Sequence, residues 1–331
     1  MQRTFQVLRV DETSKGQFEF RIEQKSLQDL PEGNTLIRVE YSSLNYKDAL
    51  SATGNRGITR AYPHIPGIDA AGKIEESDSK YFNPGDQVIV TGFDLGMNTW
   101  GGYSEYIRVP DKWVLPLPKG LTPRKAMELG TAGLTAGLSV LELLKNGIKS
   151  KDKILLTGAT GGVGIISLSV LSQIGCRVTA VTGKKDYHEL LRKMGASEIL
   201  SRHQLQEKNQ KALLKGEYAG AVDVAGGSTL AAVLKRMRYK GIVTCCGMVD
   251  SSKLETTIYP FILRGVRLIG IDSAECDLKL KKEVWNKFAA NWKFDFLPEC
   301  LTECTLEEVP HYIEKMLRGE TIGRVVVKTA R

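Results

Sequence analysis

The 331-residue sequence lacks several features that would set it apart from ordinary globular proteins. No apolar run is long enough to span a bilayer, and the mixed, polar start from Met1 to Lys15 lacks the pattern of a secretory signal. No internal repeat, low-complexity segment or CxxC pair of cysteines occurs. We therefore expect a cytoplasmic protein with no membrane partner, whose six cysteines are reduced thiols.

The sequence also lacks a cluster of basic residues, although its net charge is +8, from 46 Lys and Arg against 38 Asp and Glu. Scattered cations are not the footprint of a nucleic-acid-binding surface, so we expect no nucleic-acid partner. They do create an attractive field for small anions. The apolar fraction of 42% and the charged fraction of 25% are typical of a folded globular chain, and the length suggests two domains.

The first third of the chain has the character of β structure. Residues 35–41 alternate between apolar and polar side chains, and the sequence Asn-Pro-Gly-Asp at 83–86 signals a turn. Short strands at this spacing predict a small barrel or sandwich. At Thr122 and Pro123 the character changes, because a capping residue followed by proline is typical of a helix start.

After residue 122, strand-like and helix-like segments alternate. We expect strands at 153–157, 177–181, 198–200, 219–224, 241–246 and 266–271, and helices at 163–174, 187–194 and 230–237. Such alternation builds a doubly wound parallel sheet, so the fold class is α/β. An isolated strand at 323–328, after a helix at 306–317, is expected to return to the first domain.

A glycine-rich turn, TGATGGVG at 157–164, follows the first of these strands and opens the first of these helices. Backbone amides at a helix N-terminus, together with the helix dipole, form a site for a pyrophosphate. Glycines allow the main chain to approach the phosphates and the helix to pack closely on its strand. The turn therefore predicts a dinucleotide site.

The end of the second strand has no carboxylate. An NAD-specific site usually has an acidic residue there to bind the ribose hydroxyls. Here Thr182 and Gly183 are followed by Lys184 and Lys185, and a cation attracts the 2′-phosphate of NADPH. The cofactor predicted from these residues is NADPH, with Lys184 favoured over Lys185 as the binding residue.

Several stretches resemble one family. They are SSLNYKD at 42–48, IPGID at 65–69, GTAGLTA at 130–136, the glycine-rich turn, PFILR at 260–264 and GIDS at 270–273. Over nearly its whole length the chain resembles the medium-chain dehydrogenase/reductase superfamily, and within it the YhdH/YhfP branch of quinone oxidoreductases and acrylyl-CoA reductases.

The resemblance implies a GroES-like catalytic domain at 1–124 and 274–331, an inserted Rossmann domain at 125–273, and a homodimer. A dimer is also expected because the apolar segment 266–271 would be a sheet edge. Tyr46 would lie beside the nicotinamide, with Asn45 as a second catalytic residue. The other cofactor-binding residues implied by the resemblance are Thr131, Thr160, Gly161, Gly162, Val163, Thr182, Gly183, Lys184, Arg202, Met248, Ile262, Ser273 and Arg324.

The sequence departs from the zinc alcohol dehydrogenases of this superfamily. Asn45 stands where they have a cysteine, and Ile68 stands where they have a histidine. The stretch from Gly92 to Trp113, where their structural zinc loop would fall, has no cysteine. Zinc requires three or four thiolate, imidazole or carboxylate ligands, so no metal is expected at either place.

Without zinc, hydrogen-bond donors must stabilise the negative charge that hydride transfer places on a carbonyl oxygen. Asn45 offers an amide and Tyr46 a phenol, although Tyr46 could equally pack against the cofactor while water supplies the proton. We expect reduction of a short enoyl-CoA such as acrylyl-CoA. The alternatives are a quinone substrate, or a protein that senses NADPH or binds RNA without turnover.

Overall fold

The computed structural model describes residues 3–206, 211–293 and 295–330. The chain divides into two compact units: residues up to Thr131 together with those from Ser273 form unit 1, and Ala132–Asp272 form unit 2. The first division falls seven residues beyond the expected 124/125 boundary. The reason is that the helix beginning at Pro123 has its first turns in unit 1 and continues into unit 2.

Unit 2 contains a six-stranded sheet in the order β10-β9-β8-β11-β12-β13, in which every neighbouring pair is parallel. Its strands are β8 (Lys153–Leu156), β9 (Arg177–Thr182), β10 (Ala196–Ser201), β11 (Tyr218–Asp223), β12 (Met237–Cys245) and β13 (Arg267–Gly270). All six expected strands are present, and the prediction of a doubly wound parallel sheet is confirmed. Because the strands are parallel, their carboxyl ends share one edge, where such folds bind ligands.

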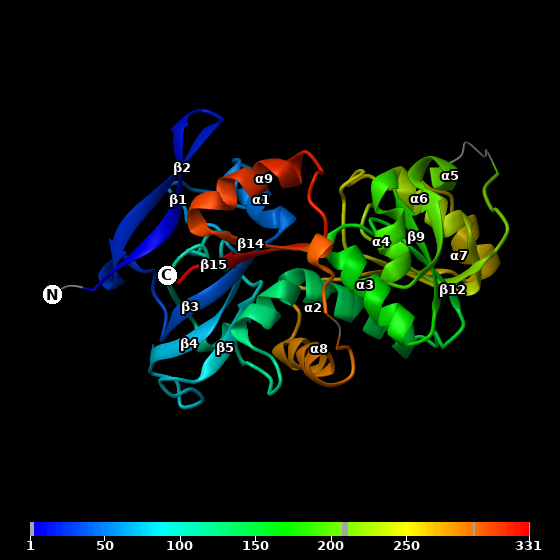
Figure 1. Cartoon of the computed structure of the whole chain (residues 1–331). Helices are drawn as coiled ribbons and strands as arrows, with labels where there is room; N and C mark the ends of the chain where they lie inside the picture. Colours follow the sequence, from blue (N-terminus) through cyan, green and yellow to red (C-terminus); the bar gives the residue numbers. More distant parts are fainter. Residues whose placement is uncertain (1–2, 207–210, 294, 331) are drawn as a thin grey trace. The chain divides into compact units, whose positions relative to one another are not determined.

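Helices connect these strands (Figure 1). They are α3 (Gly162–Gln173), α4 (His188–Lys193, preceded by the short helix η3 at Lys185–Tyr187), α5 (Arg202–Gln206), α6 (Gly227–Lys235) and α7 (Tyr259–Arg264). The sequence predicted α3, α4 and α6 but not α5 or α7, because five or six residues are too few to display a helical period. Leu155, Val181, Leu234 and Val243 belong to the core of this unit.

Unit 1 contains a seven-stranded sheet with the path β14-β15-β3-β4-β5-β7, to which β6 adds by pairing with β3. The C-terminal strand β15, red in Figure 1, runs parallel to β14 and antiparallel to β3. The prediction that the last strand returns to the first domain is therefore confirmed. The strands are β3 (Thr35–Leu44), β4 (Asp69–Ser77), β5 (Gln87–Thr91), β6 (Tyr106–Val109), β7 (Val114–Pro116), β14 (Leu301–Thr305) and β15 (Arg324–Lys328).

The helices of unit 1 are few and mostly short. They are α1 (Tyr46–Ala52), α8 (Leu278–Ala290), α9 (Val309–Leu317) and the 3-10 helices η1 (Leu27–Asp29), η2 (Asp111–Trp113), η4 (Pro298–Cys300) and η5 (Leu306–Glu308). The helix expected at 306–317 is thus η5 followed by α9. A core that includes Leu44, Ala49, Val309 and Val327 packs α1 and α9 against β3 and β15.

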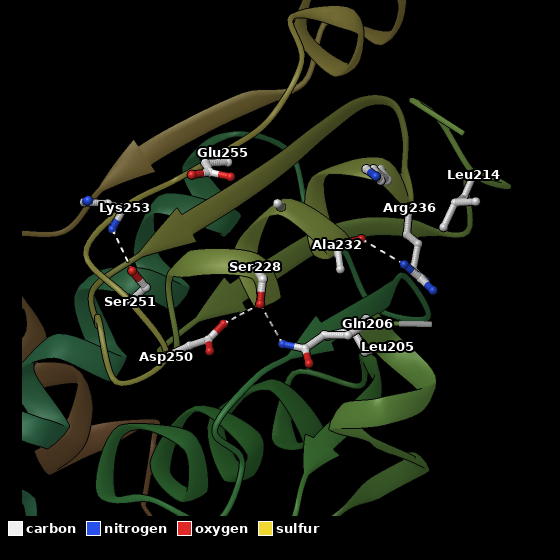
Figure 2. Close-up of a pocket in the computed structure, with 12 residues that line it drawn as sticks. Leu205, Gln206, Leu214, Ser228, Ala232, Arg236, Asp250, Ser251, Lys253 and Glu255 are labelled. Atoms are coloured by element: carbon white, nitrogen blue, oxygen red, sulfur yellow. Dashed lines mark hydrogen bonds between the residues drawn. The ribbon is translucent and has the colours of Figure 1, made fainter. Parts of the chain in front are cut away.

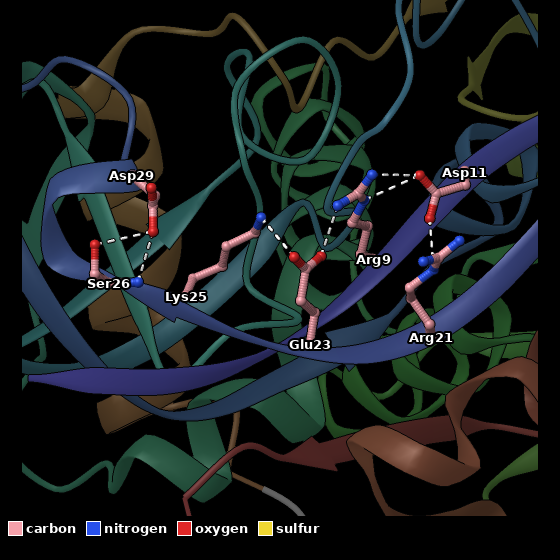
Figure 3. A network of polar contacts seen from close by, with 7 residues as sticks. All are labelled: Arg9, Asp11, Arg21, Glu23, Lys25, Ser26 and Asp29. Carbon is pink, nitrogen blue, oxygen red and sulfur yellow. Dashed lines mark hydrogen bonds and ion pairs between the residues drawn. The ribbon is translucent and has the colours of Figure 1, made fainter.

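A separate antiparallel hairpin of β1 (Thr4–Ser14) and β2 (Gln17–Ser26) carries a chain of ion pairs (Figure 3). Arg9 binds Asp11 at 2.6 Å and Glu23 at 2.7 Å, while Asp11 also binds Arg21 at 2.9 Å. Lys25 extends the chain to the other oxygen of Glu23. These pairs are partly exposed, so each adds little to the free energy of unfolding.

The helix α2 (Pro123–Lys145) begins as the sequence predicted, with the Thr122 hydroxyl accepting from the Lys125 amide at 3.1 Å. It contradicts the expectation that no apolar run is long enough to cross a membrane, because its length and composition meet that criterion. Within the structure 83% of the apolar window is buried, and a core helix passes the same test. The helix also kinks at Gly130, whose φ of 54° is not helical.

Candidate functional site

The glycine-rich turn lies between β8 and α3. Its first glycine, Gly158, has a φ of 59°, a backbone conformation that side chains other than glycine rarely adopt. A Cβ on Gly164 would lie 2.2 Å from the carbonyl oxygen of Gly158, so α3 can approach its strand this closely only with glycine there. Ile165 donates to the Gly161 carbonyl, which leaves the amides of the first turn without partners inside the helix. This turn fits a pyrophosphate.

The expected adenosine-phosphate residues gather at the same edge of the sheet. Thr182 ends β9, and its hydroxyl accepts from the Lys184 amide at 3.0 Å. A Cβ on Gly183 would meet nothing within 4 Å, so the main chain there borders open space. Thr182 pairs with Ser201, the last residue of the parallel strand β10, and Arg202 follows Ser201 at the start of α5. Two cations therefore flank the carboxyl end of β9.

The remaining residues expected around the cofactor do not share this placement. Met248 follows β12 at the carboxyl edge, with 54% of its surface exposed. Ile262 lies in α7, and its neighbour Arg264 donates to the carbonyls of Lys235 and Met237, at the opposite, amino end of the sheet. The structure does not bring Ile262 to the glycine turn, so its role in cofactor binding stays a prediction. Ser273 opens the segment that returns to unit 1.

A cavity of about 460 Å³ opens in unit 2 along α6 (Figure 2). It is lined by Leu205, Gln206, Leu214, Ser228, Ala231, Ala232, Lys235, Arg236, Asp250, Ser251, Lys253 and Glu255. None of these is an expected site residue. Asp250 accepts from the Thr229 amide and from the hydroxyls of Ser228 and Thr229, so it caps the start of α6. The glycine turn, rather than this cavity, has the features of the cofactor site.

In unit 1 the buried carboxylate of Asp69 gathers hydrogen bonds from three segments. Its Oδ2 accepts from Ser43 Oγ at 2.6 Å, Asn45 Nδ2 at 2.7 Å and the Thr131 amide at 2.8 Å. Its Oδ1 accepts from Thr131 Oγ1 at 2.6 Å. Hydrogen bonds to a charged acceptor are stronger than neutral ones. Asn45 and Thr131, both expected site residues, thus bind the same carboxylate.

The kink in α2 makes this arrangement possible. A Cβ on Gly130 would lie 2.5 Å from Asp69 Oδ2, 2.5 Å from Ser43 Oγ and 2.8 Å from Arg324 Nη2. Only glycine fits so close to these atoms, and only glycine readily adopts its positive φ. The turn at Gly130 then directs the Thr131 amide toward the carboxylate.

Arg324, at the start of β15, supplies a buried positive charge. The residue is 3% exposed, and its guanidinium donates to the main-chain carbonyls of Leu44 at 3.1 Å and Glu128 at 3.0 Å. Burial lowers the pKa of Arg324, while the nearby carboxylates of Asp69 and Asp48 act in the opposite direction. Arg324 was expected to lie near the cofactor. The structure places it among these buried groups of unit 1.

A second buried carboxylate, that of Asp48, holds the start of α1. It accepts from the backbone amides of Asn45 and Ile68, each at 2.8 Å. Burial raises the pKa of Asp48 to about 7, the charge of Asp69 adds to this effect, and the two amides oppose it. Asp48 and Asp69 together fix both the main chain and the side chain of Asn45.

Tyr46 and Asn45, the two expected catalytic residues, differ in accessibility. Tyr46 is the first residue of α1, and 40% of its surface is exposed. Asn45 is 8% exposed, its amide nitrogen donates to Asp69, and its Oδ1 lies 3.4 Å from Arg324 Nη1. The phenol of Tyr46 is therefore open to a ligand, whereas the amide of Asn45 is bound within the protein.

Comparison with known proteins identifies the family. Residues 31–119 match the alcohol dehydrogenase GroES-like domain, and residues 162–291 match the zinc-binding dehydrogenase domain. Acrylyl-CoA reductase AcuI of Ruegeria pomeroyi is 40% identical over 325 residues, covering 98% of each chain. YhfP of Bacillus subtilis, provisionally named a quinone oxidoreductase, is 42% identical over 330 residues, covering 99% of this chain and all of that one. The chain belongs to the medium-chain dehydrogenase/reductase superfamily, in its YhdH/YhfP branch.

Solved structures from the same branch of the superfamily have the same fold. The YhdH oxidoreductase of Salmonella enterica in complex with NADP has a TM-score of 0.94 at 39% identity, covering 98% of this chain and all of that one. YhfP of Bacillus subtilis with NAD bound also has a TM-score of 0.94, at 41% identity, covering 98% of this chain and 99% of that one. The predicted GroES-like and Rossmann combination is confirmed.

Although one superfamily domain is named for zinc, the donors described here do not form a zinc site. Within residues 3–206, 211–293 and 295–330, no group of three or more His, Cys, Asp or Glu side chains could hold a metal ion. At the two positions where the resemblance places zinc ligands, the buried side chain of Ile68 has no donor and the amide of Asn45 binds Asp69.

The residue that sequence reasoning missed in this superfamily member is Asp69. The motif at 65–69 was recognised as part of the resemblance, but no role was attached to its last residue. A carboxylate between apolar neighbours, at the start of a strand buried from Asp69 to Gly72, was the available signal.

Proposed function

We propose that the chain is a zinc-free, NADPH-dependent oxidoreductase that transfers hydride to an activated C=C bond, with acrylyl-CoA or a similar short enoyl-CoA as substrate. The carboxyl edge of the unit 2 sheet carries the cofactor assignment, because the glycine turn lies there beside Thr182, Lys184 and Arg202. The names of AcuI, as an acrylyl-CoA reductase, and of the NADP complex of YhdH support the substrate and the cofactor.

The charge distribution favours anionic ligands. Residues 132–272, which form unit 2, contain 20 Lys and Arg against 11 Asp and Glu, a net charge of +9. The rest of the chain contains 26 against 27, a net charge of −1. The positive field therefore belongs to the dinucleotide unit, and it attracts both NADPH and the phosphates of a CoA thioester.

Tyr46, the exposed residue of the two expected catalytic ones, has the hydrogen-bond donor that this reaction requires. A bound reduced nicotinamide supplies the hydride, which adds to the β-carbon of the enoyl thioester. The electron pair moves onto the thioester oxygen, and a proton then adds to the α-carbon. Tyr46 can donate a hydrogen bond to that oxygen as its negative charge develops. Asn45, whose amide binds Asp69, fits a positioning role better than a direct contact with the substrate.

A substrate panel tests this proposal. With NADPH, we expect faster reduction of acrylyl-CoA than of simple quinones, and no loss of activity in a strong chelator. Quinone reduction is the second candidate, supported by the provisional name of YhfP. Good quinone turnover with no turnover of any enoyl-CoA would replace our assignment. NADPH binding without reduction of any substrate would point to a sensor. Loss of activity in a chelator would show that the enzyme requires a metal.

Lys184 should determine the preference for NADPH over NADH. Lys184→Ala is expected to raise the KM for NADPH more than the KM for NADH, because the cation binds only the 2′-phosphate. Initial rates with both cofactors measure the effect. Lys153→Ala is the matched control, since its exposed side chain lies at the amino end of β8, opposite the carboxyl edge, and should change neither KM much. Equal use of both cofactors by the unmodified protein would contradict the assignment.

We also propose that the protein acts in the cytoplasm as a homodimer formed through unit 2. Among the residues that the structure describes, the sheet order ends at β13, and the outer edge of this strand can pair with a second copy. In the segment of chain that leads into β13, the apolar side chains of Ile258 and Leu263 are 66% and 59% exposed. Exposed apolar groups beside a free edge are typical of an interface.

Sedimentation at micromolar concentration should therefore give the mass of two chains. Ile258→Asp should shift the equilibrium toward monomer, because it places a charge in the apolar interface. Tyr81→Asp is the control, since Tyr81 is 71% exposed in the other unit. A protein that sediments as a monomer without any substitution would rule out this dimer.

A further inference from the structure

We propose that Asp69 is a positioning residue of the active site, whose carboxylate holds Asn45 and Thr131 in one fixed arrangement. The proposal rests on the function proposed above. It concerns a residue that touches the expected site residues without being one of them. All of the groups involved belong to unit 1.

The first argument is the number and origin of the hydrogen bonds. Asp69 accepts four of them, at 2.6 to 2.8 Å, from the end of β3, the residue before α1 and the middle of α2. Two come from Thr131, one from its amide and one from its hydroxyl, so both the main chain and the side chain of Thr131 are fixed. A single carboxylate thus sets the position of Thr131 relative to Ser43 and Asn45, which lie 88 and 86 positions earlier in the sequence.

The second argument is that the surrounding structure is arranged around this carboxylate. Gly130 adopts a left-handed conformation in the middle of α2, and a Cβ there would collide with Asp69 Oδ2. Arg324 supplies a buried positive charge close by. Kinking a helix and burying a guanidinium are both costly, so the two features together indicate a constraint beyond packing.

The third argument is the location of Tyr46. Asn45 is the residue before α1, and Tyr46 begins that helix. A carboxylate that fixes Asn45 therefore also fixes the backbone position from which the exposed side chain of Tyr46 projects. Displacing a reacting group by about 1 Å can reduce a rate by about 10². Asp69 would act on the reaction through this geometry, without contacting the substrate.

Three variants test the proposal. Asp69→Asn keeps the shape of the side chain and removes the negative charge of the carboxylate that accepts four hydrogen bonds. Thr131→Val keeps the shape of Thr131 and removes only its hydroxyl, whereas Thr131→Ser keeps the hydroxyl. We expect kcat to fall about 10²-fold in Asp69→Asn and about 10-fold in Thr131→Val, with Thr131→Ser recovering most of the turnover that Thr131→Val loses. The dissociation constant of NADPH, measured by its fluorescence, should stay within about twofold in Asp69→Asn, because Asp69 is not among the expected cofactor contacts.

Asp11→Asn is the matched control. Asp11 is another carboxylate of unit 1. It accepts from Arg9 and Arg21, and all three residues lie on the β1–β2 hairpin (Figure 3). This variant should retain kcat. Each protein is assayed well below its own melting temperature, so that loss of folded protein does not appear as loss of turnover.

The outcomes separate the alternatives. If Asp69→Asn and Thr131→Val lower the melting temperature but keep kcat, Asp69 is only structural and the proposal is wrong. If Asp69→Asn does not fold, the comparison of Thr131→Val with Thr131→Ser decides, and equal kcat values in those two would overturn the proposal. The ratios are measured with whichever substrate the unmodified protein reduces. A quinone substrate would therefore defeat the proposed function while leaving this test intact.

Discussion

Tyr46→Phe should lower the turnover of acrylyl-CoA by about 10²–10³. Removing one donor from the site where an oxyanion develops typically costs this much, because no other group is positioned to replace it. The phenol is suited to this role because 40% of Tyr46 is exposed, whereas the neighbouring Asn45 is buried and bound to Asp69. The substitution keeps the ring, so any packing against the cofactor is retained.

Single-turnover measurements with preformed NADPH complex would isolate the chemical step from substrate binding. Tyr81→Phe is the control, since this tyrosine is 71% exposed and has no expected contact with either ligand. The loss should be smaller with quinones, whose reduction is driven by aromatisation and needs less stabilisation of charge. If Tyr46→Phe keeps full turnover, the proton comes from water and Tyr46 only packs against the cofactor.

The parallel sheet of unit 2 could be predicted from the sequence because its signals are local. Each buried strand is a short apolar run, and the turn after β8 combines glycines with the start of α3 in one continuous stretch. Two features escaped prediction. The helices α5 and α7 are too short to show a period, and β12 begins at Met237, four residues before the expected start at Gly241.

The polar cluster of unit 1 could not be predicted, because its members meet only in the folded chain. The cluster comes from four places in the sequence, because Ser43 and Asn45 lie together while Asp69, Thr131 and Arg324 are each far from them. The apolar neighbours of Asp69 indicate only that it is buried, and nothing local distinguishes Gly130 from an ordinary helical glycine. The kink in α2 and the antiparallel pairing of β15 with β3 bring these groups together.

The same cluster leads to a prediction about stability. Arg324→Met should reduce the free energy of unfolding by about 3–5 kcal/mol, because it leaves the buried carboxylate of Asp69 without its counter-charge. Denaturant unfolding monitored by far-UV circular dichroism would measure the loss. Arg318→Met is the matched control: Arg318 lies close in sequence, but its ion pairs with Glu314 and Glu320 are exposed. Exposed pairs contribute about 0–1 kcal/mol, so the control should unfold nearly as the unmodified protein does.

The loss of unfolding free energy in Arg324→Met should grow as the pH rises. Arg324 opposes the effect of burial on the nearby Asp48 carboxyl group, so removing it should raise the pKa of Asp48 above about 7. A carboxyl group with a raised pKa in the folded state binds a proton that the unfolded chain releases. Its contribution to stability is therefore present at low pH and lost as the pH rises through the folded-state value. The free energy of unfolding of the variant should be closest to that of the unmodified protein near pH 5, and the difference should be largest near pH 8. A deficit that stays constant from pH 5 to 8 would mean that lost packing around the Arg324 side chain, rather than its charge, accounts for the change.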